Sequence, residues 1–114
     1  MKINDLVSLY VSYIEGPGGK KRPVLVRKVS KDRVMAFKIT TKYAHKSKFI
    51  QQQYYKIQDW KIVGLNRPSW IDVGNVYSFP KVGLTFKKIG QLTVRDQIDL
   101  DKFNVKFKEK RNRK

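Results

Sequence analysis

Three apolar-rich stretches in the first third of the chain, the first of which alternates apolar and polar residues, constrain the fold more than any other feature. They are LVSLYVSYI at residues 6–14, PVLVRKV at 23–29 and VMAFKIT at 34–40. Period-two alternation with many β-branched and aromatic residues is typical of strands. A Gly/Pro-rich loop, GPGG at residues 16–19, separates the first two stretches, and SKDR separates the second from the third. Because both connections carry turn signals, the sequence predicts an antiparallel meander over residues 6–40.

The rest of the chain predicts further strands and one late helix. YYKIQDW (54–60), SWIDVGNVYSF (69–79) and a short FKKIGQL (86–92) favour strands, whereas residues 41–53 lack a clear period and favour a long basic loop. TVRDQIDLDKF (93–103) favours a helix with Thr93 as N-cap, Asp96 at the third helical position, and an apolar face of Val94, Ile98 and Leu100. We therefore expect one small, mainly β domain over residues 1–103 with one or two short helices. Residues 104–114 are expected to form a basic tail that frays.

The charge of the chain points to a polyanionic partner. Lys and Arg number 26 against nine acids, so the formal net charge of the 114 residues is +17. RNA, DNA, an anionic membrane or an acidic protein would each complement this excess. No apolar run approaches the roughly 20 residues of a membrane span, so we expect no membrane insertion. The chain has no cysteine, which is compatible with a reducing cytoplasm, and a single histidine, His45. We expect no metal and no cofactor.

Side chains for common enzyme chemistry are mostly missing, which leaves phosphate chemistry driven by cations and hydroxyl groups. His45 is expected at the surface, and Asp72, the best-placed carboxylate, is expected in a structural salt bridge. Cleavage of RNA through its own 2′-hydroxyl needs neither a metal nor a protein nucleophile. It needs donors aimed at the charge that develops on the phosphorane, and the planar fork of arginine suits two phosphate oxygens. The sequence GGKKRP brings Lys20, Lys21 and Arg22 to the start of a strand.

Two segments resemble the PemK/MazF family of toxin–antitoxin endoribonucleases. GGKKRPVLV is followed after one strand by KITTK, and a weaker similarity continues through SWIDVGNVYSFPK and KKIGQLTVRD, so that it spans roughly residues 4–100. The resemblance implies a small SH3-like antiparallel β-barrel of the PemK/MazF/CcdB type and a homodimer. It also implies metal-independent cleavage of single-stranded RNA such as mRNA, growth arrest, and neutralisation by an acidic antitoxin.

The resemblance also implies site residues. Arg22 matches the catalytic arginine of the family and Thr40 its threonine, with Thr41 as the neighbouring alternative. The family usually has Gln, an apolar residue, a basic residue and Thr or Ser where this chain has NVYS at residues 75–78. The tyrosine there could stack on a base instead. The chain also departs from the family in its expected lack of a long final helix. The predicted substrate-binding residues are Lys20, Lys21, Thr41, Lys42, Asn75, Tyr77 and Ser78.

Plainer interpretations stand beside these. GGKKR could be a solvated hairpin loop, Thr40 and Thr41 ordinary strand-end threonines, and the tyrosines cross-strand partners. Trp60 and Trp70 are expected to fill the core. Two other functions stay open: a non-catalytic nucleic-acid-binding SH3-like module, and a toxin of the same fold that acts on a protein target such as a topoisomerase. The nuclease hypothesis makes one geometric prediction, that antiparallel pairing of the second and third strands brings Arg22 near Thr40.

Overall fold

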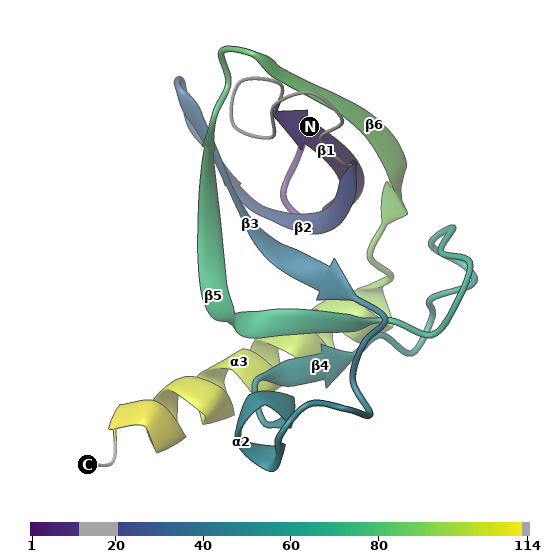
Figure 1. Ribbon diagram of the computed structural model, residues 1–114, viewed down its shortest axis with the longest axis vertical. Helices are drawn as coiled ribbons and strands as arrows, with labels where there is room; N and C mark the ends of the chain where they lie inside the picture. Colours follow the sequence, from purple (N-terminus) through teal and green to yellow (C-terminus); the bar gives the residue numbers. More distant parts are fainter. Residues whose placement is uncertain (12–20, 113–114) are drawn as a thin grey trace.

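Antiparallel pairing organises the chain into one sheet with strand order β4-β5-β3-β2-β1-β6 (Figure 1). The computed structural model describes residues 1–11 and 21–112. The strands there are β1 (Asp5–Val11), β2 (Arg22–Val29), β3 (Arg33–Thr40), β4 (Tyr54–Lys56), β5 (Trp70–Pro80) and β6 (Leu84–Gln91). The helices there are α2 (Lys48–Gln51) and α3 (Val94–Asn112). The predicted pairing of the first three strands as a meander is confirmed. The predicted GPGG loop lies outside the described residues.

The central strands of the sheet are buried on both faces, because the sheet curls and a helix covers one side. Leu25 of β2 belongs to a cluster that includes Leu100 of α3, whereas Val24 and Val26 belong to a second cluster on the opposite face. Figure 1 shows β6, β1, β2, β3 and the second half of β5 curving around a common interior, while α3 runs along the other side of the sheet. The alternation in the sequence thus fills two separate apolar layers.

The mainly β, antiparallel class predicted from the sequence is confirmed, but the sheet is not closed into a barrel. Strands β4 and β6 stand at its two edges. The sharpest curvature is a corner in β5, where the register jumps from Phe37 opposite Val76 to Lys38 opposite Asp72. The three residues in between have no partner on β3, and one of them is Gly74. Such bulges bend a strand and increase its twist.

Helix α3 corrects three expectations. It contains 19 residues and ends at Asn112, so residues 104–112 are helical rather than a frayed tail, and the chain has a long final helix. The expected apolar face is wrong at Val94 and Ile98, which are 68% and 50% exposed, and is confirmed at Leu100, which is buried. The face that packs on the sheet consists of Asp96, Leu100, Phe103 and Phe107. None of the described helices is long and apolar enough to cross a bilayer.

The buried carboxylate of Asp96 explains why this face is hard to recognise. One oxygen accepts hydrogen bonds from the Tyr55 hydroxyl (2.5 Å) and the Gln58 amide (2.9 Å), and the other accepts from the Asp59 amide (2.9 Å). The Asp96 amide in turn donates to the Thr93 hydroxyl at 3.3 Å, which confirms Thr93 as the N-cap. Burial, and then the hydrogen bond to Asp96, raises the pKa of Tyr55 above its usual value. The first residue of the α3 face that packs on the sheet is therefore an aspartate, where an amphipathic pattern would have an apolar residue.

The same carboxylate ends β4 early. Residues 54–60 were expected to form one strand, but only Tyr54–Lys56 do so, because the amides of Gln58 and Asp59 turn toward Asp96. The turn that follows packs against β6 at Gly90, where a Cβ would lie 2.1 Å from the Val63 carbonyl oxygen. Trp60 in this turn lies at the edge of the core, partly buried. The expected loop at 41–53 contains α2, which is capped by the Ser47 side chain.

We predict that Asp96→Asn destabilises the protein by about 3 kcal/mol, because an amide cannot accept hydrogen bonds on both sides and would leave a buried donor unpaired. Urea denaturation at neutral pH measures the change. Asp101→Asn is the matched control: its side chain is 70% exposed, so the free energy of unfolding should change by less than about 0.5 kcal/mol. Equal effects of the two substitutions would contradict a structural role for Asp96.

Candidate functional site

The start of β2 and the end of β3 lie at the same end of the sheet. Val24 is opposite Lys38, and continuing this register by two residues brings Arg22 opposite Thr40. Arg22 also pairs with Leu9, whose side chain belongs to the second apolar cluster. Since cross-strand neighbours project from the same face, Arg22 and Thr40 share that face. Arg22 is exposed and Thr40 is half-buried, so neither is sealed in the core.

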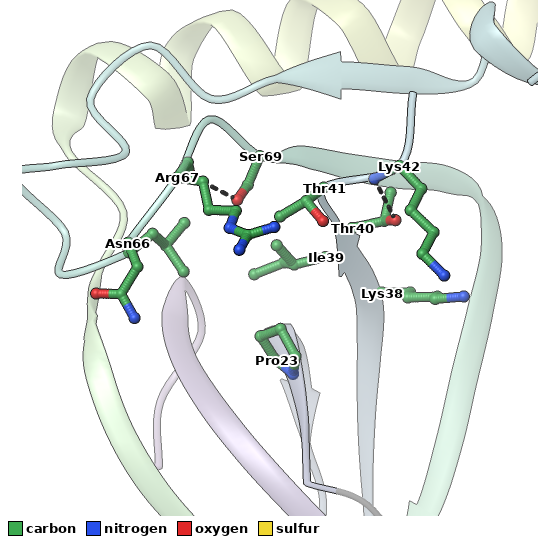
Figure 2. Close-up of a pocket in the computed structure, with 10 residues that line it drawn as sticks. Pro23, Lys38, Ile39, Thr40, Thr41, Lys42, Asn66, Arg67 and Ser69 are labelled. Carbon is green, nitrogen blue, oxygen red and sulfur yellow. Dashed lines mark hydrogen bonds between the residues drawn. The ribbon is translucent and has the colours of Figure 1, made fainter. Parts of the chain in front are cut away.

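A hollow of about 490 Å³ opens at this end of the sheet (Figure 2). The residues that line it are Pro23, Lys38, Ile39, Thr40, Thr41, Lys42, Leu65, Asn66, Arg67 and Ser69. Three of the predicted site residues, Thr40, Thr41 and Lys42, are among them. Arg22 is not, although the next residue, Pro23, forms part of the wall.

Cations surround this hollow, and none of the residues that line it carries a carboxylate. Lys38, Lys42 and Arg67 contribute three positive charges, and the exposed Lys21 and Arg22 precede the Pro23 wall. Among the described residues, no ion pair involves any of these five side chains. Figure 2 shows Arg67 extending toward Thr41. Unpaired cations around a concave surface create a positive potential that attracts phosphate groups.

The hydroxyl of Thr40 retains a proton to donate. Its oxygen accepts a hydrogen bond from the Lys42 amide at 3.1 Å, which forms a tight turn at the end of β3. A hydroxyl is one donor and two acceptors, so this bond leaves the O–H free to turn toward a ligand. On the opposite side, the Ser69 hydroxyl donates to the Arg67 carbonyl oxygen at 2.9 Å and shapes the loop that carries the arginine.

An aromatic stack holds the loop that carries Thr41 and Lys42. The ring of Tyr43 stacks on Trp70 with centroids 4.7 Å apart and planes 3° apart. Trp70 pairs with Thr40 across β3 and β5, so the stack is anchored next to the candidate site. The prediction that Trp70 fills the core is wrong: its side chain is half-buried on the sheet surface.

The other predicted site residues that the structure describes lie away from the hollow at the end of β3. Tyr77 is opposite Ala36 and projects from the same face as Thr40, farther along the sheet. Ser78 points to the other face, where its hydroxyl accepts a hydrogen bond from Arg33 at 2.7 Å. Asn75 lines a different hollow, and Lys20 lies outside the described residues.

Asp72 does not form the expected salt bridge. It is buried, and its carboxylate accepts hydrogen bonds from the side-chain amide of Gln53 (3.1 Å) and the backbone amide of Gly74 (2.9 Å). It also accepts a longer bond, of 3.4 Å, from the side chain of Asn75. Its role is structural, as expected, but it acts through neutral donors.

Sequence reasoning missed Lys38 and Arg67. Lys38 lies inside a predicted strand, where alternation alone assigns no role. Arg67 lies in the connection GLNRP, and the path of this connection depends on the contacts of the preceding turn with Asp96 and Gly90. Proline after Arg67 marks a turn in the sequence, but that signal does not say which part of the sheet the turn approaches.

The sequence matches no protein-family model and no curated protein. Within residues 1–11 and 21–112, no cluster of three or more His, Cys, Asp or Glu side chains has the arrangement of a metal site.

We predict that Tyr43→Ala frees the loop at 41–46, because it removes a stacking contact worth about 1 kcal/mol. Hydrogen exchange of the Lys46 amide, which donates to the Tyr43 carbonyl oxygen at 3.0 Å, should become faster. Tyr43→Phe keeps the ring and should leave the exchange rate unchanged. Unchanged exchange in the alanine variant would show that the stack does not hold the loop.

Proposed function

We propose that the protein is a metal-independent endoribonuclease that cleaves single-stranded RNA where β2 begins and β3 ends. The observation that carries the proposal is the register of β2 and β3, which brings Arg22 and Thr40 to neighbouring positions on one face. The unpaired cations of the adjacent hollow support it, because a single strand of RNA offers a line of phosphates to bind. The resemblance of GGKKRPVLV and KITTK to the PemK/MazF family points to the same two residues.

In the proposed reaction, the 2′-oxygen of the RNA attacks the neighbouring phosphorus and the bond to the 5′-oxygen breaks. The products are a 2′,3′-cyclic phosphate and a 5′-hydroxyl. The 2′-hydroxyl loses its proton to water, and the leaving 5′-oxygen gains one from water. The Arg22 guanidinium and the Thr40 hydroxyl donate hydrogen bonds to the non-bridging oxygens, where negative charge develops. Neither a carboxylate nor a histidine lines the hollow, so positioning and charge stabilisation supply the rate enhancement.

The wider biological role is part of the same proposal. A growth-arresting cytoplasmic toxin needs an inhibitor, and an acidic antitoxin would complement a net charge of +17. The curled sheet, with its corner in β5, supports an SH3-like barrel relationship, and the resemblance adds a homodimer.

We predict that Arg22→Ala lowers the rate of cleavage of single-stranded RNA in EDTA by at least about 100-fold, because removal of one such donor typically costs that much. Thr40→Val, which keeps the shape and removes the hydroxyl, should also lower the rate. Lys28→Ala is the matched control: it removes an exposed cation near the other end of β2 and should cleave at the parent rate. Mapping of product ends by gel electrophoresis is the measurement.

Three outcomes would contradict the nuclease proposal. If Arg22→Ala cuts as fast as the parent, the site is wrong. If the parent binds RNA with a steep salt dependence but leaves it intact, the protein is a binding module. If expression arrests growth while cellular RNA stays intact, the target is a protein.

We predict that Arg67→Gln weakens RNA binding without a comparable loss in kcat, because Arg67 lies on the wall opposite β3 and serves the RNA backbone. The slope of log Kd against log salt should fall by about 0.7, the value for one contact with a single strand. Lys61→Gln, an exposed cation in the same connection but outside the hollow, is the control. An equal change of this slope in the two variants would show that Arg67 makes no specific contact with the RNA.

A further inference from the structure

A second hollow, of about 590 Å³, lies between α2, the corner of β5 and the C-terminal half of α3. It shares no lining residue with the hollow at the end of β3. Phe49, Phe103 and Phe107 supply aromatic rings to its walls. Phe49 is 77% exposed, which is unusual for a phenylalanine on a short helix. Phe49 gives this hollow a flat apolar surface that faces solvent, and the partly buried Phe103 and Phe107 extend it toward the core.

The floor of this second hollow is made of amides in fixed orientations. The side-chain nitrogens of Gln53 and Asn75 both donate to the Asp72 carboxylate, at 3.1 and 3.4 Å. Their amide oxygens are therefore left to accept hydrogen bonds from a ligand. Gly74 makes room for this arrangement, because a Cβ there would lie 2.4 Å from the Gln53 amide carbon. The floor is built to hold acceptors in place.

Cations form the rim. Lys106, Lys110 and Arg111 line the hollow from α3, and no carboxylate lines it. Among the described residues, none of the three takes part in an ion pair. The Arg111 guanidinium lies 5.7 Å from the centre of the Phe107 ring, so charge and aromatic surface are adjacent. The ligand that complements this rim is an anion with a planar, apolar part.

We propose that this second hollow binds a nucleotide of single-stranded RNA at a distance from the phosphate that is cleaved. The base stacks on the exposed aromatic surface, its amino group donates to the amide oxygens of Gln53 and Asn75, and Lys106 and Lys110 hold the neighbouring phosphate. Unpaired bases offer both a flat face and amino groups at their edge, whereas the Asp and Glu side chains of an acidic peptide offer neither. The inference rests on the proposed function for the identity of the ligand as RNA.

The first test measures how much the rim cations contribute to the affinity for an RNA that cannot be cut. A fluorescent single strand with 2′-O-methyl groups at every position is titrated with protein and followed by anisotropy. Lys106→Gln/Lys110→Gln should raise Kd by about 10-fold or more. Lys102→Gln/Lys108→Gln is the matched control, because it removes the same charge from exposed positions of the same helix outside the hollow. It should raise Kd by less than about 2-fold, and equal losses would overturn the proposal.

The second test measures how much the exposed ring of Phe49 contributes to the affinity for the same RNA. Phe49→Ala should raise Kd for the same RNA by about 5-fold or more, within the range for one stacked base. Ile62→Ala is the control, since Ile62 is also an exposed apolar side chain and lies outside the hollow. If the two variants bind alike, bases do not stack here.

These tests do not depend on catalysis. The uncut RNA reports binding even if the nuclease proposal fails, and in an Arg22→Ala background the loss caused by Lys106→Gln/Lys110→Gln should persist. In the cleaving enzyme, the rim variant should slow cutting of a long RNA but leave cutting of a dinucleotide unchanged. If the rim variant instead loses affinity for poly-L-glutamate and keeps its affinity for RNA, the surface serves an acidic protein and the proposal is wrong.

Discussion

The buried carboxylate of Asp96 is the contact on which the rest of the architecture depends. It joins two parts of the chain that are distant in sequence: β4 with the turn that follows it, and the first turn of α3. A buried carboxyl group is stable only where hydrogen-bond partners surround it, and here a hydroxyl and two backbone amides do so. The same contact sets the course of the connection to Arg67 and the direction of α3. Each hollow therefore has one wall on a segment that this contact helps to position: Arg67 in the first and α3 in the second.

Three of the nine acidic residues, Asp5, Asp72 and Asp96, are buried and act as internal acceptors. Asp72 and Asp96 accept hydrogen bonds from neighbouring segments, whereas Asp5 accepts one from the Lys2 amide and forms an ion pair with Lys88 of β6. The hydrogen bond from Arg95, with help from Thr93, lowers the pKa of Asp59 below its usual value. A group with a depressed pKa stabilises the fold above its unfolded pKa, and this contribution is lost as the pH falls through the folded pKa. Three carboxylates thus serve the interior of the fold, and among the described residues Arg27, Lys88 and Arg95 are the cations that form ion pairs.

The sequence predicts local structure well where one physical pattern dominates. Apolar runs bounded by turn residues predict β2 and β3, and their antiparallel pairing predicts that Arg22 and Thr40 lie near each other. The pattern failed where a polar residue is buried. Asp96 stands among the residues of α3 that pack on the sheet and interrupts their apolar pattern. The sequence therefore did not predict the length of α3 or the full face that packs on the sheet. Arg67 could not be assigned to the site because a long-range contact, rather than local preference, directs its loop.

The corner in β5 ties the two hollows to one continuous backbone. Before the corner, Asp72 is opposite Lys38 of the first hollow, and its carboxylate holds the amides that floor the second. Because Asp72 is buried and paired on both neighbouring strands, the two hollows cannot slide relative to each other without breaking the sheet. A flexible strand of RNA that binds in both hollows would have to span the fixed distance between them. The fold would then select a length of RNA as well as its chemistry.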